Sequence, residues 1–204
     1  MYTPLPFTPE THVRNPDSAG LVETIRLINE ASAEDFVAAV GARLDLRGFM
    51  RQAAVENCLA DNDGLIGYAG MNNFYLYRFQ SRSLATFIPW DFSEAFKGER
   101  DYSILQHISD VPEWARNRLM ERTMAVPELR DVYFDTLLEC ASVMSTNAFL
   151  EQELLYAYDQ IRVAALEDPV KPYSNEEFES DVQKLLDFAR SRSEVIVAEV
   201  GRTR

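Results

Sequence analysis

The segment from Asp61 to Asp91 constrains the fold most, because it has the pattern of one β-hairpin inside a chain with helical periodicity elsewhere. Its sequence is DNDGLIGYAGMNNFYLYRFQSRSLATFIPWD, and it predicts strands at 74–79 and 84–88. Polar side chains stand at the ends of these strands: Asp61, Asp63, Asn72, Asn73 and Asp91. Such hard oxygen ligands, held on rigid strands, are what a Mg²⁺–phosphate site requires.

The remaining sequence predicts a mainly α domain. Residues 1–18 read as an extended arm. Amphipathic patterns predict helices at about 19–30, 112–124, 127–142 and 147–166, with others beginning after Ser32, at Asp45 and after Ser174. Ser32 with Asp35, and Ser174 with Glu177, have the spacing of capping boxes. At 204 residues, the chain is long enough for one domain with a substantial core.

Charge and cysteine content limit the partners. A net charge of −13 argues against nucleic acid and fits either cation binding or an acidic soluble surface. No apolar run reaches the length that spans a membrane, so we expect no membrane partner. Cys58 and Cys140 lie in apolar helical patterns and are interpreted as buried free thiols, with a disulfide left as the alternative.

Several kinds of site fail on spacing. The run Asp61-Asn62-Asp63-Gly64 suggests a calcium loop, but Leu65 and Asn72 then stand where ligands belong. The two histidines are not near a cysteine at zinc-ligand spacing, and no G-x-S-x-G elbow occurs. The order Asp63, Asn73, Asp91 around a hairpin is that of a kinase-type phosphoryl-transfer site, although the H-R-D motif is absent.

Each of these residues also has a purely structural interpretation. Asp and Asn favour turns, so the acidic cluster could simply shape the ends of the hairpin. The aromatic cluster of Phe74, Tyr75, Tyr77 and Phe87 is interpreted as core rather than as a ligand platform.

The stretch 45–98 resembles the CotH spore-coat kinase family of atypical protein kinases. The similar pieces are LDLRGFMRQAAVENCL, DNDG, NNFYLYRF and FIPWDFSEAF. The resemblance implies that 19–204 is the carboxy-terminal lobe of such a kinase, with Asp63 as catalytic residue and Asp91 and Asn73 as metal ligands. It also implies that Trp90 lines the nucleotide pocket. Asn72 is the alternative to Asn73 as a metal ligand, and Asp61 is an additional site candidate. The implied cofactors are Mg²⁺ or Mn²⁺ and ATP, and the implied substrate is a protein hydroxyl. The family is often associated with spore coats or the cell exterior.

The chain departs from the family pattern in ways that affect activity. Ser93 replaces the second Asp of the Asp-x-Asp run, and no lysine precedes Lys97, so no strand lysine can hold the nucleotide phosphates. Lys97 and Arg100 are weaker candidates for phosphate contact. We therefore expect ATP-dependent Ser/Thr phosphotransfer only in a full-length parent. The alternative is a non-catalytic scaffold that binds a partner protein. In either case the missing amino-terminal lobe should leave an apolar surface that favours self-association.

Overall fold

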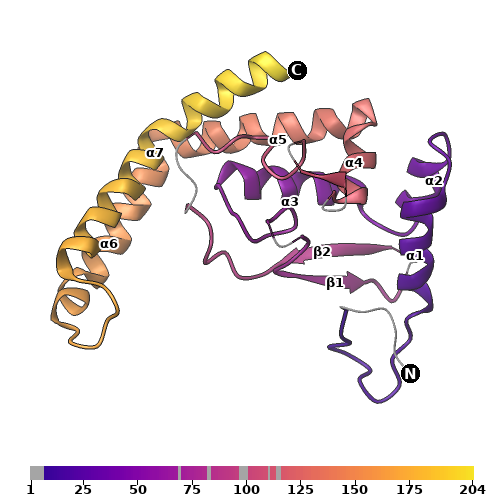
Figure 1. Cartoon of the computed structure of the whole chain (residues 1–204), viewed down its shortest axis with the longest axis horizontal. Helices are drawn as coiled ribbons and strands as arrows, with labels where there is room; N and C mark the ends of the chain where they lie inside the picture. Colours follow the sequence, from indigo (N-terminus) through magenta and orange to yellow (C-terminus); the bar gives the residue numbers. More distant parts are fainter. Residues whose placement is uncertain (1–6, 69, 82–83, 97–100, 110, 114–115) are drawn as a thin grey trace.

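The structure, a computed structural model, describes residues 7–68, 70–81, 84–96, 101–109, 111–113 and 116–204. It is mainly helical with one two-stranded antiparallel sheet, which confirms the predicted fold class (Figure 1). The helices are α1 (Ala19–Glu30), α2 (Phe36–Gly41), α3 (Leu46–Cys58), α4 (Arg118–Met124), α5 (Pro127–Ser145), α6 (Phe149–Glu167) and α7 (Asn175–Thr203). A short 3₁₀ turn (Thr146–Ala148) joins α5 to α6, and the strands are β1 (Phe74–Arg78) and β2 (Ala85–Pro89).

Helix α3 lies at the centre, between α5 on one side and the hairpin on the other (Figure 1). Its apolar side chains, among them Phe49 and Met50, are buried together with Tyr133 and Leu137 of α5. The α6–α7 pair extends to one side of this body, and α7 packs against α5. Helix α3 therefore joins the core directly to the turn that follows it, where the acidic residues begin.

The hairpin is held against the start of α3. The backbone N–H of Asp45 donates to the carbonyl of Ala85 at 2.9 Å, and the N–H of Ala85 donates to the carbonyl of Arg43 at 2.7 Å. Phe87 of β2 packs on Phe49, with ring centroids 5.5 Å apart. The hairpin is thus placed on the core through β2, which fixes the position of both strand ends.

The two faces of the hairpin differ, because successive side chains of a strand point to opposite sides. Phe74 and Phe87 pack on each other with ring centroids 5.0 Å apart, as the core interpretation predicted. Tyr75 and Tyr77 are 40% and 48% exposed, so the core interpretation was wrong for them. No described element covers the outer face of the hairpin, the face that carries Tyr75 and Tyr77. The aromatic residues of this face are therefore exposed on the surface.

Side-chain caps begin three of the described α-helices, α3, α4 and α7. The side chain of Asp45 accepts from the N–H of Gly48 at 2.9 Å, and the Ser174–Glu177 capping box is present. Ser32 and Asp35 also bond to each other, but the regular helix begins only at Phe36. The start predicted at residue 112 was wrong. Helix α4 begins at Arg118, because the Asn117 side chain caps it by accepting from the N–H of Met120 at 3.0 Å.

The interpretation of the cysteines as free thiols was also wrong. Cys58, at the end of α3, and Cys140, on α5, form a disulfide with their Cα atoms 6.6 Å apart. The two residues are separated by 82 positions in the sequence and meet because α3 and α5 pack together. The bond therefore fixes the end of α3, three residues before Asp61, to the neighbouring helix.

The arm before α1 lies against the hairpin in the part of it that the structure describes. The ring of Phe7 packs edge-on against Phe74, with centroids 5.9 Å apart, and Asp17 lies 3.5 Å from Arg78. Lys97 and Arg100, considered above as phosphate ligands, lie outside the described residues. Among the described helices, none combines the length and the apolar character needed to cross a bilayer.

Candidate functional site

The site begins where α3 ends. Ala60 has a left-handed backbone (φ 52°) that stops the helix, and the N–H of Asp61 donates back to the carbonyl of Glu56 at 2.9 Å. Asp61 is only 2% exposed, and its carboxylate accepts from the N–H of Asp63 at 3.1 Å. The chain thus leaves the core in a tight turn, with one buried carboxylate and one half-buried carboxylate two residues apart.

Both asparagines before β1 bond to Asp63. The side-chain Nδ2 of Asn72 donates to both carboxylate oxygens of Asp63, at 3.1 Å each. The Nδ2 of Asn73 donates to the backbone carbonyl of Asp63 at 2.9 Å and to its Oδ2 at 3.1 Å. The Asp63 carboxylate is therefore held in one orientation by groups nine and ten residues further along the chain.

The hairpin register brings Asp91 to the same end. The N–H of Trp90 donates to the carbonyl of Asn73 at 2.9 Å, one step beyond the Phe74–Pro89 pair. Asn73 and Asp91 both have left-handed backbones, with φ of 51° and 48°, which Asn and Asp adopt more readily than most residues. Hydrogen bonds from Ser93 lower the pKa of the exposed Asp91 carboxyl, so this carboxylate stays charged.

The carboxylates of this region repel one another. Burial raises the pKa of Asp61, and repulsion from Asp63, Glu94 and Asp91 raises it further. Within the described residues, no group of three or more His, Cys, Asp or Glu side chains is close enough to enclose a metal ion. The donor set, carboxylate and amide oxygens with mutual repulsion, fits a hard cation that takes part of its ligands from a phosphate.

Hydrogen bonds join Asp63 to Asn72, Asn73 and Asp61, and Asp91 follows Trp90, whose N–H bonds to the carbonyl of Asn73. The roles assigned to these residues stay predictions. Trp90 directly follows β2, but it is 59% exposed. Its ring packs on that of Tyr75, with ring centroids 5.3 Å apart. An apolar cleft of about 480 Å³ lies between α1 and the inner side of the hairpin, and neither Trp90 nor any acidic candidate lines it. The nucleotide-binding role of Trp90 stays a prediction.

Sequence reasoning missed Glu56, which lies directly beneath the acidic turn. This residue is 2% exposed, and its carboxylate accepts from the N–H of Leu65 at 2.7 Å and from the Nε2 of Gln52 at 2.9 Å. Burial raises its pKa to about 7. The available signal was its place among buried positions of α3, where a charged residue is rare unless it has partners.

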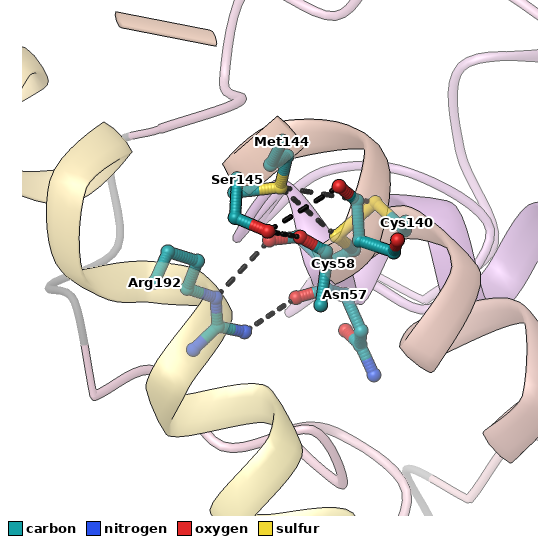
Figure 2. The surroundings of a disulfide bond; sticks show 8 residues. Asn57, Cys58, Cys140, Met144, Ser145 and Arg192 are labelled. Carbon is teal, nitrogen blue, oxygen red and sulfur yellow. Dashed lines mark hydrogen bonds between the residues drawn. A yellow bond between two sulfur atoms is a disulfide. The ribbon is translucent and has the colours of Figure 1, made fainter. Parts of the chain in front are cut away.

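Arg192 was missed as well. Its side chain is fully buried and donates to two carbonyls at the end of α3, those of Cys58 at 3.1 Å and Asn57 at 2.7 Å (Figure 2). Figure 2 also shows the disulfide beside these bonds, with the Sδ of Met144 3.3 Å from the Sγ of Cys58. The spacing Phe188, Arg192, Ile196 places the arginine on the apolar side of α7, which was the available signal.

Comparison with known proteins gives two findings. The family model described as CotH kinase protein matches residues 2–196. The chain is also similar to "Inner spore coat protein H" of Bacillus subtilis (strain 168), with 25% identity over 187 residues. This alignment covers 88% of the chain and 48% of the relative, so the chain spans about half the length of the curated relative it matches.

Proposed function

The chain belongs to the CotH kinase protein family, and from this premise we propose that it forms the metal-binding, acceptor-orienting half of an ATP-dependent protein kinase. The transfer would go to a Ser or Thr hydroxyl of a protein substrate. One observation carries the proposal: the hairpin register and the two asparagine side chains gather Asp63, Asn73 and Asp91 at one end of the hairpin.

Within this proposal Asp63 orients the acceptor hydroxyl and accepts its proton. Its carboxylate is already fixed by the Nδ2 groups of Asn72 and Asn73, so little reorganisation is needed when a hydroxyl arrives. The side-chain Nδ2 of Asn73 donates to Asp63. The side-chain oxygen Oδ1 of Asn73 is therefore the atom that would bind a metal ion. Asp91 and Asn73 would hold Mg²⁺ or Mn²⁺, which supplies neutralisation of charge on the ATP phosphates. The buried carboxylate of Asp61 would add negative charge that attracts the metal ion.

The relative's name connects it to the inner spore coat, and we propose a comparable setting for this chain. The Cys58–Cys140 disulfide supports a place outside the reducing cytosol, since structural disulfides persist mainly in oxidising environments.

The test is phosphate transfer from labelled ATP to a protein acceptor. The full-length protein, with this chain joined to an amino-terminal lobe, should be active with Mg²⁺ or Mn²⁺. Asp63→Ala should abolish the activity, whereas Asp159→Ala, an exposed carboxylate on α6, should not change it. The isolated 204-residue chain should give no signal above background, because losing even one electrostatic contact costs about 10²–10³ in rate. Full activity of Asp63→Ala would refute the assignment of the site.

A second candidate is a non-catalytic scaffold that binds a partner protein. It is favoured by the uncovered outer face of the hairpin, with Tyr75, Tyr77, Ile88, Trp90 and Phe92 all at least 40% exposed. The phosphate-transfer assay separates the two: a scaffold transfers no phosphate even as wild type, and it loses its partner protein in Trp90→Ala but keeps it in Asp63→Ala.

A further inference from the structure

Glu56 joins the core to the acidic turn. It stands in the last turn of α3, and its carboxylate faces out of the helix toward residues 64–66. Oε2 accepts from the N–H of Leu65 at 2.7 Å, and the N–H of Ile66 also bonds to the carboxylate. Oε1 accepts from Gln52 on the preceding turn of the same helix at 2.9 Å. One buried side chain therefore binds the segment that follows Asp63 from beneath.

The Glu56 carboxylate packs closely against Gly64. A Cβ atom added at Gly64 would lie 2.6 Å from both the Cδ and an Oε atom of Glu56, closer than real side chains approach. From the other side the chain folds back over the turn. A Cβ at Gly67 would lie 2.8 Å from the carbonyl of Asn62 and 3.0 Å from the Cα of Asp63. The turn is thus enclosed between the Glu56 carboxylate and the returning chain.

The same segment leads to the asparagines that hold Asp63. The N–H of Asn72 donates to the carbonyl of Gly64 at 3.1 Å, so Gly64 touches Glu56 on one side and bonds to Asn72 on the other. The amide of Asn72 in turn bonds to the Asp63 carboxylate. A short chain of contacts therefore leads from Glu56 through Gly64 and Asn72 to Asp63.

We propose that Glu56 is a positioning residue: its hydrogen bonds to the turn fix Gly64 and Asn72 and thereby set the orientation of the Asp63 carboxylate. The proposal rests on the proposed function for the importance of that orientation, but the positioning itself can be measured without any activity. Glu56 touches neither substrate nor metal in this assignment and acts only through the turn.

The variants follow from the bonding. Glu56→Gln keeps an oxygen for the Leu65 N–H, and its amide can donate to Gln52 once the Gln52 amide turns over. Glu56→Ala removes both acceptors and leaves the buried N–H groups of the turn unpaired. Gly64→Ala should displace the carboxylate sterically and reproduce the effect of Glu56→Ala. Gly201→Ala is the matched control, because nothing lies within 4 Å of a Cβ added there.

The first readout is NMR of the 204-residue chain. The side-chain amide protons of Asn72 and Asn73 report on their bonds to Asp63. We expect them to shift in Glu56→Ala and Gly64→Ala and to match wild type in Glu56→Gln and Gly201→Ala. Slow amide exchange in α5 checks that each variant is folded. Unchanged Asn72 and Asn73 amide signals in folded Glu56→Ala would overturn the proposal, as would a Glu56→Gln spectrum that matches Glu56→Ala.

The second readout uses the full-length protein and separates kcat from KM. Misplacing a catalytic group by about 1 Å can cost about 10² in rate. Glu56→Ala should lower kcat by roughly 10- to 100-fold with KM for ATP nearly unchanged, and Glu56→Gln should restore kcat. An equal loss in both variants would overturn positioning through hydrogen bonds. If wild type itself transfers no phosphate, the proposed function fails, and the NMR comparison still decides the role of Glu56.

Discussion

Reduction of the Cys58–Cys140 disulfide should destabilise the chain strongly without unfolding it at room temperature. The bond joins residues 82 positions apart, and closing a loop of that size lowers the entropy of the unfolded chain by an amount worth about 4 to 5 kcal/mol. For a domain of this size, such a loss lowers Tm by roughly 10 to 15 °C. Arg192 still holds the carbonyls of Asn57 and Cys58 after reduction, so we expect the reduced chain to keep its fold.

The assay is thermal unfolding followed by circular dichroism, with and without a thiol reductant. A Cys58→Ala/Cys140→Ala variant is the control: its Tm should be low and insensitive to reductant. Counting thiols on the denatured, unreduced protein gives an independent check and should find none. Two free thiols, or a wild-type Tm that reductant leaves unchanged, would refute the reasoning from loop entropy.

Other predictions concern metal, pH and association. Calorimetric titration should show weak Mn²⁺ binding that Asp91→Ala removes, and identical curves would leave the acidic cluster as turn structure only. Burial raises the pKa of Glu56 from its ordinary 4.5 to about 7, so the folded state binds this proton more tightly than the unfolded state and stability falls as pH rises between those values. Glu56→Gln should therefore gain up to about 3 kcal/mol in urea unfolding at pH 8 and little at pH 4, and an equal gain at both would contradict the shift. In sedimentation at high concentration, wild type should self-associate and Trp90→Ala should self-associate less. A strictly monomeric wild type would count against self-association through the exposed aromatic face of the hairpin.

The sequence predicted those elements whose signals are local. The Ser174–Glu177 capping box and the Asp45 cap involve residues three apart, so the sequence contains both partners of each bond. The hairpin strands were predicted to within one residue, because alternation and the flanking turns lie in the same short segment. The start of α4 was mispredicted although its cap is local, since the Asn117 side chain accepts from the N–H of Met120, three residues on. The same side chain also donates to the carbonyl of Leu65, a distant contact that only the tertiary structure shows.

Burial within an element was harder to predict. Alternation in β1 shows that Phe74 and Tyr75 point to opposite faces, but not which face the core covers. That choice depends on α3, which packs Phe49 against Phe87 and leaves Tyr75 and Tyr77 outside. The residues of the candidate site were easier to find, since Asp63, Asn72 and Asn73 lie within ten positions of each other.

By itself the sequence determined the helices, the hairpin and the set of polar residues at its ends, because periodicity, caps and turns act over a few residues. Only the tertiary structure decided what supports them. The disulfide spans 82 positions, and the bond from Arg192 to Cys58 spans 134. Glu56 reads in sequence as one more acidic residue of an amphipathic helix. Its role depends on its burial beneath the turn that follows α3. That burial results from the packing of separate segments, and the sequence alone does not show which segments lie close together in space.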